Sequence, residues 1–156
     1  MILGDDQLDA TARDAKVVLG ALTVESINPD VYTIVELANA ANAKHCERAH
    51  ANEIVVTCDL GSGLIARAAL DHGITRVVSD LLSSHHGEEL YKLAVPVSMV
   101  GRRFIEVMTE MKQQHASIVL AVQKGSEGPV TCNPPADYSL EKDDHLFVVA
   151  AERPEL

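Results

Sequence analysis

The chain has 156 residues, of which 47% are hydrophobic, 23% charged and 3% aromatic, and this composition excludes disordered, collagen-like and disulfide-rich proteins. Its formal net charge of −10 would repel a phosphate backbone, so we expect no nucleic acid among its partners. No apolar run approaches the ~20 residues of a membrane-spanning helix, and the start MILGDDQLD has no signal-peptide pattern, so we expect a cytoplasmic chain.

Apolar, β-branched segments alternate with helical patterns through the first half of the chain. Asn28-Pro29-Asp30 ends the first helix, because a residue before proline is driven out of the α region. We expect strands at 1–4, 31–35, 53–57 and 75–79, and helices at 8–22, 41–49 and 64–72. This alternation predicts right-handed βαβ units and a parallel sheet.

The second half of the chain has a different rhythm. We expect strands at 89–95, 117–123 and 145–150 and a helix at 101–114. The strand at 117–123 precedes the turn-rich segment 124–129, and we expect another strand after that segment. These patterns predict a small antiparallel α+β unit. An apolar helical stripe is expected to pack in its core, or else to form an oligomer face: Phe104, Val107, Met108 and Met111.

The predicted parallel sheet is incomplete. Residues 1–80 supply too few strands for an open parallel sheet, and the chain starts inside a strand. Because an uncovered sheet edge invites association, we expect a preceding segment or another chain along that edge.

Two stretches resemble one known family. The run ILGDDQLDATARDAKVVLGALTVESINPDVYTIVELANAANAKHCERAHANEIV is similar to the second half of the Rossmann-like RCK domain, the regulator of potassium conductance, or TrkA nucleotide-binding domain. NPPADYSLEKDDHLFVVA, at 133–150, resembles the C-terminal subdomain of that family. The resemblance implies an α/β fold, with a partial Rossmann-like parallel sheet over 1–82, a linker over 83–88 and a small α+β subdomain over 89–156.

The resemblance also implies a function. It is that of a cytoplasmic, ligand-sensing gating-ring domain at the inner face of the membrane, regulating a potassium channel or transporter. The expected partners are further copies of the chain, as a dimer or ring, and a channel pore domain or transporter membrane subunit. Family members bind calcium or a nucleotide (NAD or ADP/ATP), but the family's phosphate loop is absent from this chain. His50 and Asp143 stand where the family commonly has turn glycines, so both turns are expected to be distorted.

Asp5, Asp6 and Glu36 are the candidate metal ligands. They lie at the ends of two neighbouring predicted strands, where open α/β sheets bind ligands. Their oxygens could bind calcium or another divalent cation, which takes ~6–8 oxygen ligands. The alternative is that Asp5 or Asp6 caps the helix that follows.

Gly61-Ser62-Gly63 offers a second hypothesis. We expect it to follow a strand and open a helix, and with Ala66 and Asp80 it satisfies the letter of a dinucleotide-binding motif. Gly61 and Gly63 are therefore candidate cofactor-binding residues, and a dinucleotide-dependent enzyme is the alternative function. A purely structural assembly domain that binds no ligand is the third reading.

Other chemistry has little support in the sequence. His85, His86, Glu88 and Glu89 could bind zinc, but neighbouring side chains of an extended segment point apart, which favours a solvated linker. The three cysteines are expected to be reduced and buried. No catalytic triad, HExxH motif or phosphate-binding GKS loop occurs, so we expect no enzyme.

Overall fold

The computed structural model describes residues 1–83 and 87–156, which form two compact units, Met1–Ile74 and Thr75–Leu156. The predicted linker 83–88 contains residues 84–86, which lie outside the described part, so the predicted linker boundaries stay a prediction. Within the described part, no helix is both long and apolar enough to cross a membrane.

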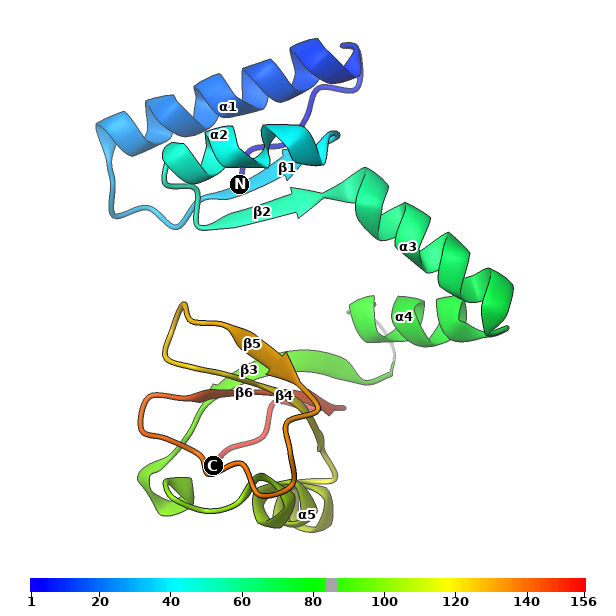
Figure 1. The fold of residues 1–156 in the computed structure, drawn as a ribbon, viewed down its shortest axis with the longest axis vertical. Coiled ribbons are helices and arrows are strands. Elements are labelled where there is room, and N and C mark those ends of the chain that lie inside the picture. Colours follow the sequence, from blue (N-terminus) through cyan, green and yellow to red (C-terminus); the bar gives the residue numbers. More distant parts are fainter. Residues whose placement is uncertain (84–86) are drawn as a thin grey trace. The chain divides into compact units, whose positions relative to one another are not determined.

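The first unit alternates helices and strands, as the sequence predicts (Figure 1). Its elements are α1 (Ala10–Ile27), β1 (Ile34–Leu37), the 3-10 helix η1 (Ala40–Asn42), α2 (Ala43–Arg48), β2 (Glu53–Val56) and α3 (Thr57–Leu70). Strands β1 and β2 are parallel, with Ile34 opposite Glu53 and Leu37 opposite Val56. Ile2 extends this sheet, because its N–H donates to the Ile34 carbonyl at 2.8 Å and its carbonyl accepts from Glu36 at 3.0 Å.

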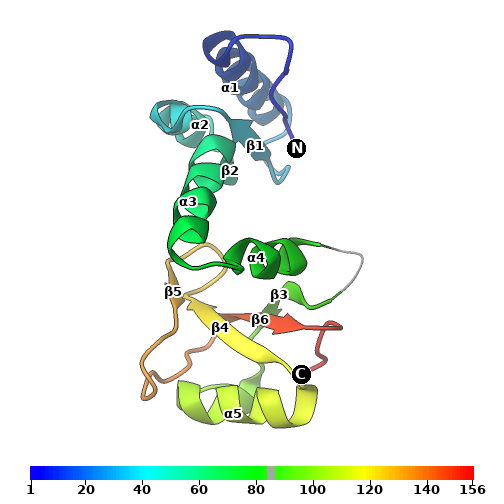
Figure 2. The ribbon, with the colours of Figure 1, turned by 90° about the vertical axis from the view of Figure 1, so that its right-hand side faces the viewer.

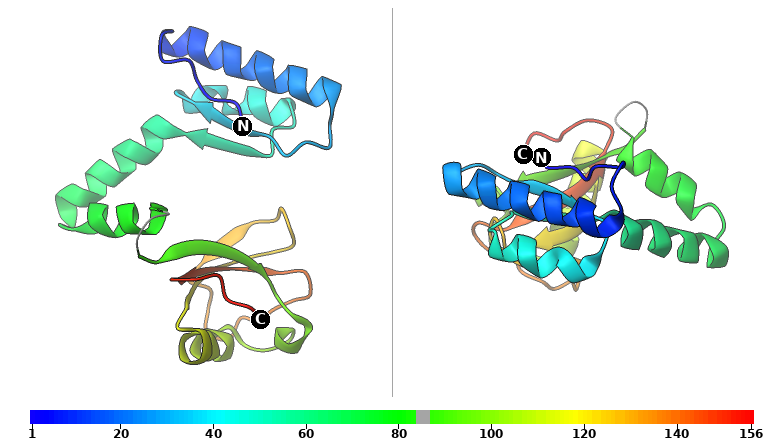
Figure 3. Two further views of the ribbon diagram at one scale, coloured as in Figure 1. Left: turned by 180° about the vertical axis from the view of Figure 1, so that it is seen from behind. Right: turned by 90° about the horizontal axis from the view of Figure 1, so that it is seen from above.

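The core of the first unit lies between the sheet and helices α1 and α2, which lie beside each other (Figure 3). The Asp9 carboxylate caps α1 by accepting from the backbone N–H groups of Thr11 and Ala12. Six buried residues make up this core: Val17, Ala21, Val35, Leu37, Cys46 and Ala49. Helix α3, in contrast, buries none of its residues.

The second unit contains a four-stranded antiparallel sheet with strand order β3-β6-β4-β5. Its elements are α4 (Ile74–Leu82), β3 (Glu89–Ala94), the 3-10 helix η2 (Val97–Met99), α5 (Phe104–His115), β4 (Ile118–Gln123), β5 (Val130–Cys132) and β6 (His145–Ala150). Helix α5 covers one face of the sheet (Figure 2). The predicted apolar stripe is confirmed as core, because Phe104, Val107 and Met111 are all buried there.

One predicted strand is wrong. Residues 75–79 belong to helix α4, not to a strand of the parallel sheet. The run Thr75-Arg76-Val77-Val78-Ser79 is rich in β-branched residues, which favours a strand, but its partly buried residues Ile74, Val78 and Leu81 recur at helical spacing. Strand β1 also lies later than expected, at Ile34–Leu37 instead of 31–35.

The two turns that lack the family's glycines have a left-handed backbone. The φ angle is 56° at His50 and 71° at Asp143, in the region that glycine adopts without steric cost. Each non-glycine residue there strains the turn that it occupies.

The prediction of buried cysteines holds only for Cys46, which lies in the core of the first unit. Cys58 is exposed on α3, and Cys132 is exposed on the short edge strand β5. Helix α3 buries none of its residues and all three residues of β5 are exposed, so a cysteine on either element is accessible to solvent.

Candidate functional site at the carboxyl edge of the parallel sheet

The three predicted metal ligands lie near the same edge of the first unit, but each is paired with a cation of the protein. Arg13 of α1 contacts Asp6 through Nη1 and Glu36 through Nη2, each at 2.9 Å. Lys16 Nζ contacts Asp5 at 2.7 Å. The structure therefore brings together an ionic network that also includes Arg13 and Lys16, which the sequence analysis did not single out.

Glu36 has the largest number of partners in this network. Its Oε2 accepts from the backbone N–H of Gly4 at 3.1 Å, and its Oε1 accepts from Arg13. The Gly4 N–H holds the pKa of Glu36 below its usual value, and Arg13 and the Thr57 hydroxyl act in the same direction against partial burial. Glu36 is thus a charged carboxylate that joins the first residues of the chain, α1 and the start of α3.

Asp5 is fixed more loosely. The Lys16 ammonium and the backbone N–H of Gln7 both hydrogen-bond to it, and they lower its pKa. Its hydrogen bond to Gln7 closes a local turn before α1, and the α1 cap is Asp9, so the predicted alternative of Asp5 or Asp6 as the helix cap is wrong.

A metal ion does not fit this edge as it stands. Within residues 1–83 and 87–156, no three His, Cys, Asp or Glu side chains gather so that they could hold an ion. The carboxylates are paired instead with the guanidinium of Arg13 and the ammonium of Lys16. Of the predicted histidine cluster, His85 and His86 lie outside the described residues, and Glu89 begins strand β3 opposite Ala150.

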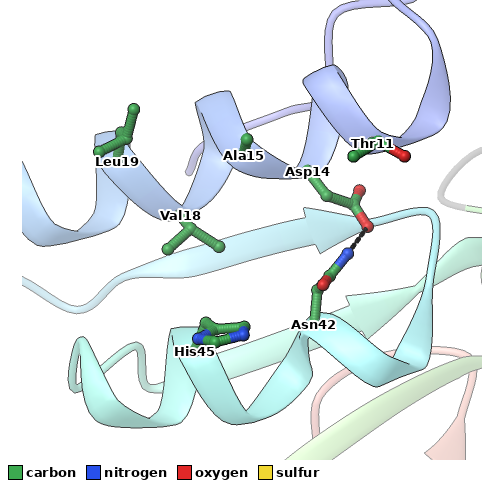
Figure 4. A pocket seen from close by; sticks show the side chains of 7 residues that line it. All are labelled: Thr11, Asp14, Ala15, Val18, Leu19, Asn42 and His45. Atoms are coloured by element: carbon green, nitrogen blue, oxygen red, sulfur yellow. Dashed lines mark hydrogen bonds between the residues drawn. The ribbon is translucent and has the colours of Figure 1, made fainter.

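Asp14 is a buried carboxylate that the sequence analysis missed. It is 1% exposed and accepts from the backbone N–H groups of Ala38 at 2.8 Å and Asn39 at 3.0 Å. Asn42 Nδ2 donates to it at 2.7 Å (Figure 4). Burial raises the pKa of Asp14, but these hydrogen bonds outweigh burial and lower it. The signal in the sequence was its spacing, since Asp14, Val17 and Ala21 share the buried face of α1.

A shallow pocket with a volume of about 410 Å³ lies between α1 and α2. Asp14 and Asn42 meet at one end of it, while Val18 and the His45 ring lie along it (Figure 4). Its lining is Thr11, Asp14, Ala15, Val18, Leu19, Asn42 and His45. Both oxygens of Asp14 are already engaged within the protein, so the pocket offers an incoming ligand mostly apolar surface.

The predicted turn at Gly61-Ser62-Gly63, between a strand and the start of a helix, does not form. Gly61 and Gly63 lie inside α3, which begins at Thr57 directly after β2, so the glycines do not open the helix. Their backbone N–H groups lie beyond the first turn, where a helix satisfies its own donors. The geometric prediction behind the dinucleotide-binding enzyme is therefore wrong.

A family model described as "Castor and Pollux, part of voltage-gated ion channel" matches residues 58–155. This chain belongs to the Castor and Pollux family. The match covers nearly all of α3 and the second unit, which together exceed half of the chain.

Two relatives of this Castor and Pollux chain extend the likeness to the first unit. The calcium-gated potassium channel TvoK of Thermoplasma volcanium is 24% identical over 143 residues, covering 92% of this chain and 40% of that protein. YugO of Bacillus subtilis, named as a potassium channel protein, is 30% identical over 156 residues, covering 96% of this chain and 44% of that protein. The chain thus spans less than half the length of either relative.

The fold is also found in part of a solved structure. The structure of the human SLO3 gating ring matches 96% of this chain with a TM-score of 0.79 and 15% identity, over 32% of its own chain. The family match and the two relatives confirm the resemblance to the potassium-channel regulatory family, and the parallel and antiparallel sheets confirm the predicted α/β fold class.

Proposed function

We propose that this chain is a ligand-responsive regulatory domain of a potassium channel or transporter, assembled as a dimer or ring at the cytoplasmic face of the membrane, and that it is not an enzyme. The proposal is supported by potassium-channel relatives along almost the whole chain and by a two-unit fold shared with a gating ring. The single observation that carries the assembly step is helix α3, which is long, apolar and uncovered.

Helix α3 has 14 residues and buries none of them within the chain. Leu60, Ile65 and Leu70 are between 66% and 76% exposed. An isolated helix of ~12–15 residues is only marginally stable in water, and helices in proteins gain most of their stability from tertiary packing. We infer that a second copy of the chain covers α3, so that the helix is ordered in an oligomer.

Helix α4 supports the same reading. It also buries none of its residues, and Val77 and Leu82 are 58% and 75% exposed. Several large exposed apolar side chains on one helix are typical of an interaction site. Helix α3 in the first unit and α4 in the second would each supply a surface for a partner. The further partner of the assembled ring would be the pore domain or membrane subunit whose gate the ring controls.

Regulation would follow from differential binding. A ligand shifts an equilibrium between two ring conformations only by the difference in its affinity for them. Calcium or another divalent cation is the ligand to test first, because TvoK is a calcium-gated channel. A nucleotide such as NAD, ADP or ATP is the next, because the family resemblance implies it. Calcium at Asp5, Asp6 and Glu36, and a nucleotide at Gly61 and Gly63, stay predictions, and the structure favours neither.

The assembly step is tested by light scattering after size-exclusion chromatography of the whole chain. Leu60→Asp places a charge on the exposed apolar face of α3, and we expect it to shift the chain to monomer. Ser62→Asp is the matched control, because it adds the same charge to α3 without removing an apolar side chain. A wild-type chain that is monomeric at high concentration, or equal behaviour of the two variants, contradicts the proposal.

The regulatory step is tested in the full-length protein that carries this domain. Potassium flux should respond to ligand in the wild type, and Leu60→Asp should uncouple the flux from the ligand while the Ser62→Asp control responds normally. An assembled protein whose flux responds to neither divalent cations nor adenine nucleotides would favour the purely structural assembly domain.

A further inference from the structure

We propose that the segment 124–129, which joins β4 to β5, is a movable strap over one face of the second sheet, and that Lys92 holds it closed. When the Lys92 contact is lost, the strap opens locally and uncovers the end of the sheet around His145, while the rest of the unit stays folded. The inference concerns the second unit alone and does not depend on the proposed channel function.

The strap lies on the side of the sheet opposite α5 (Figure 1). The adjacent strands β3, β6 and β4 each bury residues in the core that α5 covers. Because the side chains of a strand alternate between its two faces, the sequence neighbours of these buried residues project from the other face. Three polar residues are such neighbours: Lys92 of Leu93, Gln123 of Val122, and His145 of Leu146.

Lys92 makes the contact to the strap that is most distant in sequence. Its Nζ atom donates to the Ser126 carbonyl at 2.9 Å, across 34 residues. The ammonium also lies 6.0 Å from the centre of the Phe147 ring, at the outer limit of a cation–π contact. Lys92 belongs to β3, which is separated from β4 by β6, so this contact ties the strap across the sheet.

Two further donors come from β4 and β6. Gln123 Nε2 donates to the Gly128 carbonyl at 2.9 Å. His145 Nδ1 lies 3.0 Å from the Gly125 carbonyl and donates to it when that nitrogen carries a proton. Both glycines are half-buried and Ser126 between them is exposed, so the strap meets the sheet at the two glycines.

The closed shape of the strap requires these glycines. Gly125 has a φ of 61°, which glycine adopts without steric cost, and a Cβ atom at Gly128 would overlap the Lys124 carbonyl. The Lys124 N–H donates to the Pro129 carbonyl at 3.2 Å and closes the base of the strap. In the open form this bond is broken together with the side-chain contacts, so hydrogen exchange at the Lys124 amide reports the opening.

Gln123 makes the closed form costly. Its Oε1 atom is buried and has no hydrogen-bond partner among the described residues. A buried acceptor without a partner is unfavourable, and opening the strap gives it access to water. The closed form therefore depends on contacts that outweigh this loss, and Lys92 supplies a hydrogen bond from a charged donor.

The test compares the whole wild-type chain with Lys92→Met, which keeps an apolar stem and removes the ammonium. Exchange at the Lys124 amide, followed by NMR, is expected to be about twofold to tenfold faster in the variant, the range that corresponds to one net hydrogen bond. Exchange at Leu146 and Val148, in the core of β6, should stay unchanged. Trypsin should also cleave after Lys124 faster in the variant.

Lys112→Met is the matched control. Lys112 is an exposed lysine of the same unit, and its Nζ also contacts a backbone carbonyl, that of Ala116 at 3.4 Å. This variant should exchange at Lys124 like the wild type. Equal exchange at Lys124 in Lys92→Met and in the control overturns the proposal. Faster exchange at Lys124 and throughout β6 overturns it as well, because Lys92 would then stabilise the whole unit.

A measurement on the wild type decides the matter if Lys92→Met does not fold. Urea accelerates exchange in proportion to the surface that an opening exposes. Exchange at Lys124 through a local opening should therefore depend little on low concentrations of urea, whereas exchange at Leu146 should rise with it. The same urea dependence at both amides would mean that the strap does not open by itself, contrary to the proposal.

Discussion

Replacing Asp14 by asparagine changes one buried carboxylate into an amide of nearly the same shape. In the wild type, Asp14 accepts three hydrogen bonds, from the backbone N–H groups of Ala38 and Asn39 and from the Asn42 amide, at 2.7–3.0 Å. The amide oxygen of asparagine can still accept a hydrogen bond, but its NH₂ group is a donor and would face a donor of the protein where a carboxylate oxygen accepted before. Since a hydrogen bond to a charged group contributes ~1.5–3 kcal/mol, we expect Asp14→Asn to lower the free energy of unfolding by about 2–4 kcal/mol.

Urea unfolding followed by circular dichroism measures this loss, and amide hydrogen exchange at Ala38 and Asn39 locates it. Asp9→Asn is the matched control, because Asp9 is an exposed helix cap and asparagine caps about as well as aspartate. We expect the control to stay within about 0.5 kcal/mol of the wild type. Equal stability of the two variants, with unchanged exchange at both amides, would refute the role given to Asp14.

The contribution of Asp14 also depends on pH. Its pKa in the folded protein lies below the ordinary value of 3.8, so the folded state binds fewer protons than the unfolded state near that pH. The stabilisation is therefore complete above the unfolded pKa and is lost progressively as the pH falls through the folded one. Asp14→Asn should show a smaller loss of stability between neutral and acidic pH than the wild type.

Three further variants test other parts of the fold. His50→Gly should raise the free energy of unfolding by about 0.5–1 kcal/mol in urea titrations, because His50 has a φ of 56° that glycine adopts without strain; no change would contradict that strain. Met111→Ala should cost about 2–5 kcal/mol, because Met111 is 0% exposed under the second sheet, and a variant melting like the wild type would contradict its core role. Burial and the hydrogen bond to Asp144 raise the pKa of Tyr138 to about 12, so Asp144→Asn should lower that value in a spectrophotometric titration, with Tyr138→Phe identifying the signal.

The sequence predicted an element correctly where its residue composition and its apolar spacing indicate the same type of structure. The apolar runs at Glu53–Val56 and His145–Ala150 form β2 and β6 as expected, and α1 ends at the proline break. The stripe on α5 was predictable because burial on one face imposes a 3.6-residue period. At 75–79, β-branched composition and helical spacing disagreed, and the spacing decided the structure.

The candidate site was predictable only in part, because its chemistry depends on long-range pairing. Parallel strand ends place Asp5, Asp6 and Glu36 near one edge, which follows from strand order. The partner of Glu36 is 23 residues away on the preceding helix, and no local pattern indicates that the guanidinium turns toward the strand. The prediction that Gly61 opens a helix was wrong because α3 begins four residues earlier, at Thr57, so that Gly61 lies inside the helix.

The ionic edge and the uncovered helix meet at one residue, which bears on how a signal could travel. Strand β2 ends at Val56 and α3 begins at Thr57, so no loop separates the sheet from the helix. The Thr57 hydroxyl hydrogen-bonds to Glu36, whose carboxylate also binds Arg13 of α1. No side chain hydrogen-bonds as an N-cap at the start of α3, so the negative charge of Glu36 beside its first turn favours the helix through its dipole. A change in the charge balance at Glu36 would therefore alter the start of the helix that buries none of its residues.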